Sequence, residues 1–311
     1  MATPAIKQEW ATITGEFNDE ESKSRFSKYA VANANMNRYN DVLPYEETRV
    51  LIPIIPEDHQ YPIPEAFVEY KDSYDRRRDY INASYITIDG PSKIILTQAP
   101  QPATVDTFWW MVWHHNIEMI GMFTSFEEAG RTKAMTYWPK REGQVLNVLG
   151  GKLSIINQGV HVLPAEPVKI GSSQTDETSE VYDLLLSYSP VDGEISYTKE
   201  VTHFHYRSWP DKEVPQRTEN LIFFLHTLSL LRKKNVHNGS LNTTPFVFHC
   251  SAGIGRAGTM AASFRHITTK EPIFDVVRSI RKDRHSLVQT GAQYAFVYRL
   301  TEAYMRAYPR E

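Results

Sequence analysis

The stretch FVFHCSAGIGRAGTM at residues 246–260 joins an apolar run, a glycine-rich segment and a helix-forming run without interruption. Residues 245–249 predict a short buried strand, SAGIGRAG predicts a tight turn, and TMAASFRHIT predicts a helix that begins where the turn ends. Such a loop can turn successive backbone N–H groups inward, beside the positive end of the helix dipole, and so bind a tetrahedral anion. Arg256 adds a planar, two-pronged donor that suits phosphate oxygens.

Cys250, the one cysteine in 311 residues, stands at the start of this turn. The amides, the helix dipole and Arg256 all stabilise negative charge there, so they favour the thiolate, a nucleophile that would face the bound anion. A small buried hydrophobe is the commoner role of an isolated cysteine, but it leaves the arginine and the glycines unexplained. Gly253, Gly255 and Gly258 also fit a dinucleotide-binding pattern, yet only 53 residues follow the last of them, too few for a two-halved nucleotide-binding sheet.

Hydrophobic periodicity divides the chain into strands and helices, with no internal repeat and no linker between two halves. Helical patterns occur at 104–117, 216–234, 258–269, 271–283 and 290–307. Strand-like runs occur at 94–97, 118–123, 152–157, 181–188, 195–206 and 245–249. The sequence therefore predicts one domain of mixed strands and helices.

Two polar segments are predicted to form loops between strands, and one aromatic cluster is predicted to pack in the hydrophobic core. Pro190, Asp192 and Gly193 lie between two alternating runs, which is typical of a hairpin turn. The polar, acidic segment 164–180 is expected to be an exposed loop. Three tryptophans at helical spacing predict core packing and not a cofactor site: Trp109, Trp110 and Trp113.

Composition and charge describe an ordinary globular chain. Lysine and arginine total 34 against 37 acidic residues, a net charge of -3, which predicts no nucleic-acid-binding surface. The N-terminus lacks the pattern of a secretory signal and one cysteine cannot close an intrachain disulfide, so we expect a reducing, cytoplasmic location. The most apolar stretch, 221–231, is far shorter than the roughly 20 residues of a membrane span and predicts a buried amphipathic helix.

Six further motifs accompany HCSAGIGRAG, in the order NRYNDVLPY (37–45), DYINASYI (79–86), TQAP (97–100), KAMTYWP (133–139), WPDKEVP (209–215) and QTGAQYAF (289–296). Together they resemble the protein tyrosine phosphatases, and specifically their tyrosine-specific, single-domain, non-receptor branch. The resemblance implies an α/β fold in which helices flank a central twisted mixed β-sheet, with the phosphatase-type arrangement of strand, phosphate loop and helix. It places the catalytic domain at 25–308, after an N-terminal extension at 1–24 that we expect to be helical.

The resemblance also implies an activity, the hydrolysis of phosphotyrosine in proteins through a cysteinyl-phosphate intermediate. Cys250 would attack phosphorus, and Asp211 would protonate the departing tyrosine oxygen. Gln289, helped by Gln293, would place the water that frees the enzyme. Arg256 would hold the phosphate oxygens together with the amides of the loop, which are those of Ser251, Ala252, Gly253, Ile254 and Gly255.

Two residues of the NRYND motif would form the rim of the pocket. Tyr39 matches a ring that stacks on the phenol of the substrate, and Asp41 matches a carboxylate that fixes the peptide backbone. A deep pocket reaches phosphotyrosine but leaves phosphoserine short of the thiolate. A lone tyrosine is more often a core aromatic, so the assignment of Tyr39 depends on the resemblance.

Four residues would support the reacting groups from behind. Glu128 matches the carboxylate that orients the loop arginine, with Glu127 as an alternative because the segment EEAGRTK can shift by one residue. Tyr137 matches a hydroxyl near His249, which is expected to be an electrostatic aid and not a base. Lys133 matches a partner of the acid-bearing loop.

The sequence departs from the family at several positions. Ala257 stands where a serine or threonine usually donates a hydrogen bond to the cysteine sulfur, which predicts slower breakdown of the intermediate. Lys212 and Glu213 replace a common Phe-Gly pair, Asn40 replaces a frequently basic residue, and Ala134 replaces a cysteine. Ala257 and the altered acid loop leave one alternative open, a catalytically impaired phosphotyrosine-binding module. A second alternative is a dual-specificity or lipid phosphatase with the same loop, against which the segment that contains Tyr39 argues.

No cofactor or metal is expected. The pairs His114-His115 and His203/His205 lack further ligands at the spacing of a zinc site. The expected partners are phosphotyrosine-containing proteins, with no nucleic acid and no membrane span, and the sequence gives no basis for an oligomeric state.

Overall fold

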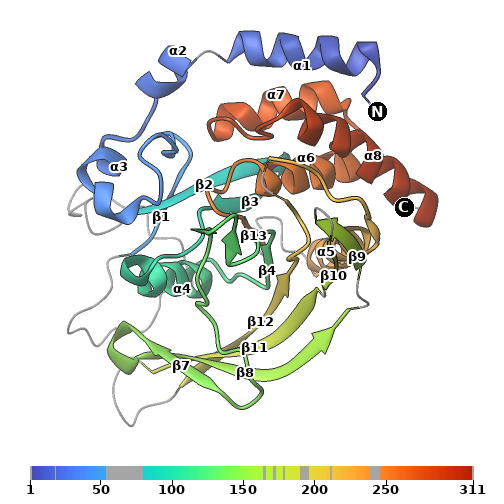
Figure 1. Ribbon diagram of the computed structural model, residues 1–311. Helices are drawn as coiled ribbons and strands as arrows, with labels where there is room; N and C mark the ends of the chain where they lie inside the picture. Colours follow the sequence, from blue (N-terminus) through green and yellow to red (C-terminus); the bar gives the residue numbers. More distant parts are fainter. Residues whose placement is uncertain are drawn as a thin grey trace.

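Nine strands form one mixed sheet in the part of the chain that the structure describes, and helices cover both of its faces (Figure 1). The structure is a computed structural model that describes residues 2–17, 19–53, 80–163, 166–170, 173–177, 179–189, 196–210, 212–238 and 246–309. Across the sheet the strands run β1 (Arg49–Leu51), β2 (Tyr80–Asp89), β3 (Ser92–Thr97), β13 (Phe246–His249), β4 (Met119–Met122), β12 (Tyr197–His205), β11 (Glu180–Tyr188), β8 (Leu153–Val162) and β7 (Val145–Val148). The predicted mixed α/β fold is confirmed.

The strand before Cys250 lies in the middle of this sheet. β13 pairs parallel with β3 on one side and with β4 on the other, and β4 pairs parallel with β12. All four residues of β13 are buried, as the continuous apolar run FVFH requires of a strand covered on both faces. The pairs that lie outside these central strands are antiparallel.

The helices of the described residues divide between the two faces. One face packs against α5 (Glu219–His237), α6 (Arg256–Thr269), α7 (Ile273–Asp283) and α8 (Gly291–Ala307), and α1 (Pro4–Glu16) packs outside them on α7 and α8. The other face packs against α4 (Val105–His114), whose three tryptophans are buried as predicted. Short helices complete this part of the chain: α2 (Asp19–Ser24), α3 (Lys28–Ala32), η1 (Ala34–Met36), η2 (Pro102–Thr104) and η3 (Leu149–Gly151).

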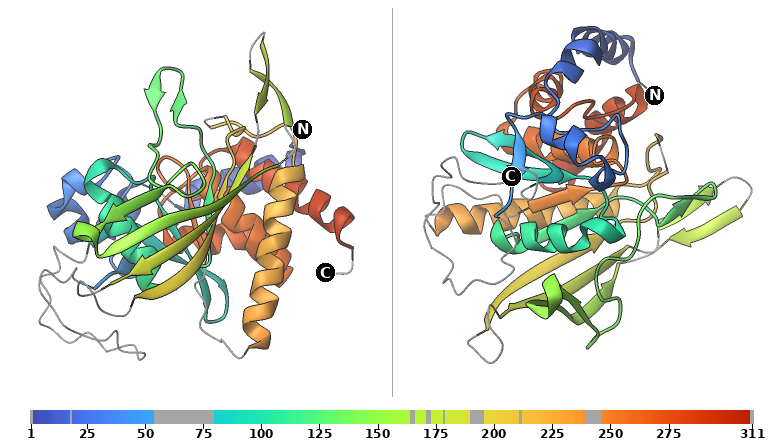
Figure 2. Two further views of the ribbon diagram at one scale, coloured as in Figure 1. Left: turned by 90° about the horizontal axis from the view of Figure 1, so that it is seen from below. Right: turned by 90° about the vertical axis from the view of Figure 1, so that its left-hand side faces the viewer.

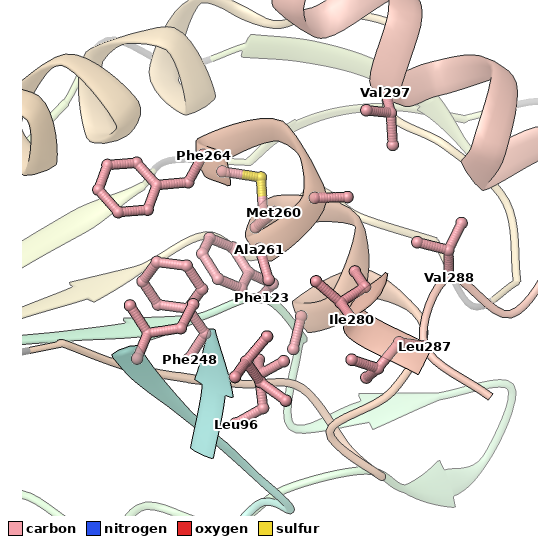
Figure 3. Close-up of a cluster of buried hydrophobic side chains, with 14 of the residues drawn as sticks. Leu96, Phe123, Phe248, Met260, Ala261, Phe264, Ile280, Leu287, Val288 and Val297 are labelled. Atoms are coloured by element: carbon pink, nitrogen blue, oxygen red, sulfur yellow. The ribbon is translucent and has the colours of Figure 1, made fainter. Parts of the chain in front are cut away.

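Successive side chains of the central strands point to opposite faces of the sheet and belong to two separate hydrophobic cores. In β13, Phe248 points into the core under α6, whereas Val247 points into the core under α4. Figure 3 shows the first of these cores, where Met260, Ala261 and Phe264 of α6 pack over side chains of the sheet. The helix that follows the glycine-rich loop is therefore fixed directly over the strand that precedes it.

The helix α6 begins at Arg256, two residues before the predicted start at 258, so Gly258 lies inside the helix. A Cβ atom on Gly258 would lie 2.7 Å from the backbone nitrogen of Val288, so the glycine permits α6 to approach the segment before α8. Most other predicted elements occur within a few residues of their expected bounds. Of the main sheet, the strands β1, β2 and β7 were not among the predicted strands.

The predicted exposed loop at 164–180 is wrong in its central part. Two strands, β9 (Glu166–Ile170) and β10 (Ser173–Glu177), pair antiparallel there and form a ribbon separate from the main sheet (Figure 2). Polar composition does not prevent such pairing, because the backbone supplies the hydrogen bonds of a solvated antiparallel pair. The predicted hairpin at 188–197 is confirmed by the pairing of β11 with β12, while residues 190–195 lie outside the described residues.

The segment 221–231 forms part of α5, and the buried side chains Leu221, Phe224, Leu225 and Leu228 confirm the predicted amphipathic helix. In the described part of the chain, none of the helices has the length and apolar character that crossing a membrane would require.

Candidate active site

The loop from Cys250 to Gly255 connects β13 to α6 at the centre of the molecule. Its shape depends on Gly253, which has a φ of +73°. A Cβ atom on Gly253 would also lie 2.1 Å from the carbonyl oxygen of Thr97, at the end of the neighbouring strand β3. Both the left-handed backbone and this close approach exclude a side chain, which explains why the loop contains glycine at this position.

Every backbone carbonyl of the loop accepts a hydrogen bond. Side chains bind three of these carbonyls: His249 Nδ1 donates to Cys250, and Arg284 donates to Ala252 and to Gly253. Backbone N–H groups bind the other three: that of Ala99 donates to Ser251, those of Gly258 and Val288 both donate to Ile254, and that of Thr259 donates to Gly255. The amides of residues 251–255 donate to no acceptor in the described part of the chain. A loop with its carbonyls occupied and its amides available suits an anion, as the sequence predicts.

Arg284 fixes the direction of two of these peptide groups. Its guanidinium is completely buried and donates from Nε to Gly253 O at 3.1 Å and from Nη2 to Ala252 O at 3.1 Å. Because C=O and N–H point in opposite directions in a trans peptide, the N–H groups of Gly253 and Ile254 are turned away from Arg284. Sequence analysis did not identify Arg284 as a site residue.

The same guanidinium connects the loop to the NRYND segment. It donates to Asn82 Oδ1 at 2.8 Å and to Ser84 Oγ at 3.1 Å, both on β2. Asn82 in turn donates to Asn37 Oδ1 and to the carbonyl of Val42. Burial lowers the pKa of Arg284 to about 10, and the nearby charges of Tyr80 and Cys250 oppose that shift, so the guanidinium stays charged at neutral pH.

Arg256 begins α6 and is held by one carboxylate in a two-pronged contact. Its Nη1 lies 2.6 Å from Glu128 Oε1 and its Nη2 lies 2.7 Å from Glu128 Oε2, and Nη1 also donates to Thr124 Oγ1 at 2.7 Å. Arg256 is 3% exposed, so this pair orients a nearly buried guanidinium. Glu128, and not its alternative Glu127, is therefore the carboxylate that orients the arginine.

A tight hairpin explains why the register favours Glu128. β5 (Glu127–Glu128) pairs with β6 (Arg131–Thr132), and the two residues between them, Ala129 and Gly130, have φ values of 49° and 72°. Positive φ at both central residues is typical of a two-residue hairpin turn. Successive strand residues point to opposite sides, so Glu127 is exposed while Glu128 faces Arg256.

Tyr39 reaches the loop at Ser251. The Ser251 hydroxyl donates to the carbonyl of Lys133 at 2.8 Å, so its oxygen is left to accept from the Tyr39 hydroxyl at 3.0 Å. Tyr39 is half-buried, whereas Asp41 is exposed two residues further on. Lys133 thus contacts the loop through its main-chain carbonyl, and Tyr39 contacts the loop through its hydroxyl.

Gln289 and Gln293 lie against the far end of the loop. A Cβ atom on Gly255 would lie 3.1 Å from Gln289 Oε1 and 3.0 Å from Gln293 Nε2, so both side-chain amides touch the backbone at Gly255. Gln293 is buried in the first turn of α8, and its Oε1 accepts from the backbone N–H of Gln289 at 2.8 Å. The helix is capped by Thr290, whose hydroxyl oxygen accepts from the N–H of Gln293.

Asp211, the predicted acid, lies outside the described residues. Residues on either side of it are anchored: the Trp209 indole donates to the carbonyl of Glu213 at 2.9 Å, and Thr290 Oγ1 donates to the carbonyl of Lys212 at 3.2 Å. Lys212 has a φ of 58°, in the left-handed region that residues other than glycine rarely adopt. The acid-bearing segment is thereby connected to the segment that holds Gln289.

A chain of buried polar groups supports the loop from below. His249 Nδ1 donates to the carbonyl of Cys250 at 3.0 Å, so His249 Nε2 accepts from the Tyr137 hydroxyl at 2.5 Å. The Tyr137 oxygen then accepts from His203 Nε2 at 2.7 Å. Tyr137 is therefore near His249 as predicted, and His203 is a member that sequence analysis assigned to no site.

Three histidines in this region should make the protein sensitive to mild acid. Burial lowers the pKa of His249 to about 3, and it lowers the pKa values of His203 and His205 below 6.5 as well. An unfolded chain therefore binds more protons than the folded one below pH 6.5, so stability is full above that pH and falls as the pH decreases. His249 alone, with its pKa at about 3, should cost on the order of 1 kcal/mol per pH unit below pH 6.5, and His203 and His205 should act in the same direction.

We expect the thermal unfolding midpoint to fall steadily between about pH 7 and pH 5, measured by circular dichroism. Glu180, whose pKa is lowered chiefly by its hydrogen bond with His205, loses its contribution only below its ordinary value of 4.5. The carboxylate therefore does not account for a change in this window. A midpoint that stays constant over the range would contradict the neutral state of the three imidazoles.

The geometry of this site agrees with comparisons with known proteins. A family model described as protein-tyrosine phosphatase matches residues 33–302. The chain is 32% identical to human receptor-type tyrosine-protein phosphatase eta over 282 residues and 33% identical to human receptor-type tyrosine-protein phosphatase H over 283 residues; each match covers 89% of this chain. It is 30% identical to mouse tyrosine-protein phosphatase non-receptor type 18 over 316 residues, which covers 94% of this chain.

The chain spans only part of these relatives, namely 18% of the eta protein, 22% of the H protein and 58% of the non-receptor protein. The region of similarity includes the loop, the arginine and the pocket segments described above. The family match extends over most of the chain, and this protein therefore belongs to the protein-tyrosine phosphatase family.

Proposed function

We propose that this chain hydrolyses phosphotyrosine in proteins through a cysteinyl-phosphate intermediate. The observation that carries the proposal is the loop at 250–255, where a lone thiol adjoins amides that are available to an anion and an arginine held by Glu128. Its relatives are named tyrosine-protein phosphatases, which supports the same substrate class. Fixed donors of this kind stabilise the charge of a transferring phosphoryl group.

In the first half-reaction, the sulfur of Cys250 would form a bond to phosphorus while the bond between phosphorus and the tyrosine oxygen breaks. Arg256 and the loop amides would hold the three equatorial oxygens. The departing oxygen would take a proton from Asp211, an assignment supported by the WPD motif and by the family. The products would be a tyrosine side chain and phosphorylated Cys250.

In the second half-reaction, a water oxygen would bond to phosphorus and the bond between sulfur and phosphorus would break. The ionised Asp211 would take the proton of that water, and Gln289 and Gln293 are placed against Gly255 where they can orient it. Ala257 is completely buried and offers no hydroxyl to the departing sulfur. We therefore expect hydrolysis of the intermediate to be the slow half of the reaction.

Selectivity for phosphotyrosine can be tested with matched peptides. We expect the protein to release phosphate from a phosphotyrosine peptide at least about 100-fold faster than from the same peptide with phosphothreonine, because Tyr39 at the rim sets a depth that a short side chain cannot span. Phosphate release at equal peptide concentration is the measurement. Tyr39→Ala should reduce the ratio, since it shortens the wall of the pocket.

Two results would favour the alternatives. Comparable rates on both peptides would indicate a dual-specificity phosphatase. Tight binding of the phosphotyrosine peptide without any phosphate release would indicate a catalytically impaired binding module. Because the mechanism requires the thiol of Cys250, we also propose that the protein acts in a reducing compartment such as the cytoplasm.

A further inference from the structure

The helix α1 precedes the region that the family model matches, yet it packs closely against the catalytic part of the chain. It lies over α7 and α8 (Figure 1), whereas the family match begins at residue 33. Ile13 is completely buried in the core, and Trp10 and Phe17 pack against the same core. α1 therefore occupies a defined position next to the segment that carries Gln289.

Trp10 touches the main chain at the first residue of α8. Its Cδ1 and Nε1 atoms lie 3.1 and 3.3 Å from the place where a Cβ atom on Gly291 would be, so any side chain there would have to displace the indole. The indole also packs against the ring of Tyr294, with centroids 5.6 Å apart. Gly291 lies between Gln289 and Gln293 in the sequence, and its lack of a side chain is what allows Trp10 to approach.

The same indole covers the arginine that holds the preceding residues. The guanidinium carbon of Arg281 lies 4.9 Å from the Trp10 ring centroid, a cation–π contact at a nearly buried site. Arg281 donates from Nε to the carbonyl of Leu287 and from Nη2 to that of Val288, each at 2.9 Å. Gln289 and Thr290 lie between Val288 and Gly291 in the sequence. Trp10 therefore contacts the chain on both sides of them: it touches Gly291 directly, and it touches Arg281, which binds the carbonyl of Val288.

Polar contacts determine where α1 sits. One carboxylate oxygen of Glu9 accepts hydrogen bonds from the hydroxyls of Tyr294 and Tyr298, each at 2.6 Å. Glu16 pairs with Arg278 of α7 at 2.5 Å, a more exposed contact that contributes less. These contacts fix the helix along its length, so the placement of Trp10 is specific.

We propose that Trp10 is a positioning residue for Gln289, and that α1 acts through it on the hydrolysis of the cysteinyl phosphate. This inference rests on the function proposed above. Loss of the indole would free Gly291 and Arg281, so the segment 287–291 would hold the Gln289 amide less firmly against Gly255. Formation of the intermediate uses Cys250, Arg256 and Asp211 and should not depend on this contact.

Rapid-quench mass spectrometry of the full chain with p-nitrophenyl phosphate gives both rate constants, because the phosphorylated enzyme is heavier by one phosphoryl group. For Trp10→Ala we expect the hydrolysis constant to fall about tenfold and the formation constant to stay within about twofold of wild type. Trp10→Phe should restore most of the loss, since a ring again covers Gly291. Gln8→Ala, an exposed change on the same helix, is the matched control and should change neither constant.

Gly291→Ala tests the contact from the other side, because the added methyl would push the indole by a few tenths of an ångström, and it should slow hydrolysis selectively as well. The unfolding midpoint of each variant shows whether it is folded at the assay temperature. Equal losses in both rate constants, or no loss in either for the folded Trp10→Ala and Gly291→Ala proteins, would overturn the inference. Absence of any phosphorylated wild-type enzyme would instead refute the proposed function.

Discussion

Replacing Cys250 by serine should reduce release of p-nitrophenol from p-nitrophenyl phosphate by a factor on the order of 10⁴ or more. The protein should still fold, because the side chain is 5% exposed and serine is slightly smaller. An alcohol is a far weaker nucleophile than a thiolate at neutral pH. The sequence of 311 residues contains no second cysteine that could replace the thiol. The donors that hold the phosphoryl group would remain in place.

Binding and chemistry can be separated in this variant. Cys250→Ser should still bind a phosphotyrosine peptide, measured by calorimetry, with a dissociation constant above the Michaelis constant of the wild type, because slow hydrolysis of the intermediate lowers KM below Kd. Quenched wild-type enzyme should carry one phosphoryl group on Cys250, and the variant should carry none. Turnover by Cys250→Ser at a rate near that of wild type would remove the cysteine from the mechanism and, with it, the proposed function.

The sequence was sufficient to predict the centre of the site because its chemistry is local. Cys250, Gly253, Gly255 and Arg256 lie within seven consecutive residues, and a buried strand, a tight turn and a helix leave that segment few possible shapes. The resemblance added Gln289 and Tyr39, and the structure places both against the loop. The choice between Glu127 and Glu128 needed the hairpin geometry of the structure. Successive strand residues point to opposite sides, so a shift of the strand pairing by one residue would turn the other carboxylate toward Arg256.

Other contributors could not be predicted because their partners are remote in the chain. Arg284 reaches Asn82, 202 residues away, and no short pattern distinguishes it from Arg278 and Arg281 nearby. His203 was considered only as a metal ligand and rejected, whereas its contact is with Tyr137, 66 residues away. The ribbon at β9 and β10 was missed because its polar composition resembles that of a loop.

Arg284→Met should lower kcat/KM for a phosphotyrosine peptide by about 10² to 10³, the range expected when a preorganised donor is lost. Methionine has a similar length but donates no hydrogen bond, so the carbonyls of Ala252 and Gly253 would be free to rotate toward the pocket. Their peptide N–H groups would then turn away from the anion. The variant also removes a positive charge that lies close to Cys250.

Stability should change less than activity in Arg284→Met, which separates this prediction from simple unfolding. Four acceptors would lose their donor, at about 1–3 kcal/mol each if they remained unpaired, but removal of a buried charge offsets much of that cost.

Arg265→Met is the matched control, because Arg265 is also nearly buried but donates to Thr87, Glu271 and Ser279 instead of the loop. It should lower the urea midpoint without lowering kcat/KM of the folded protein. If Arg284→Met kept the wild-type kcat/KM while folded, the loop amides would not need this arginine, and the preorganisation of the site would have to come from the sheet and α6 alone.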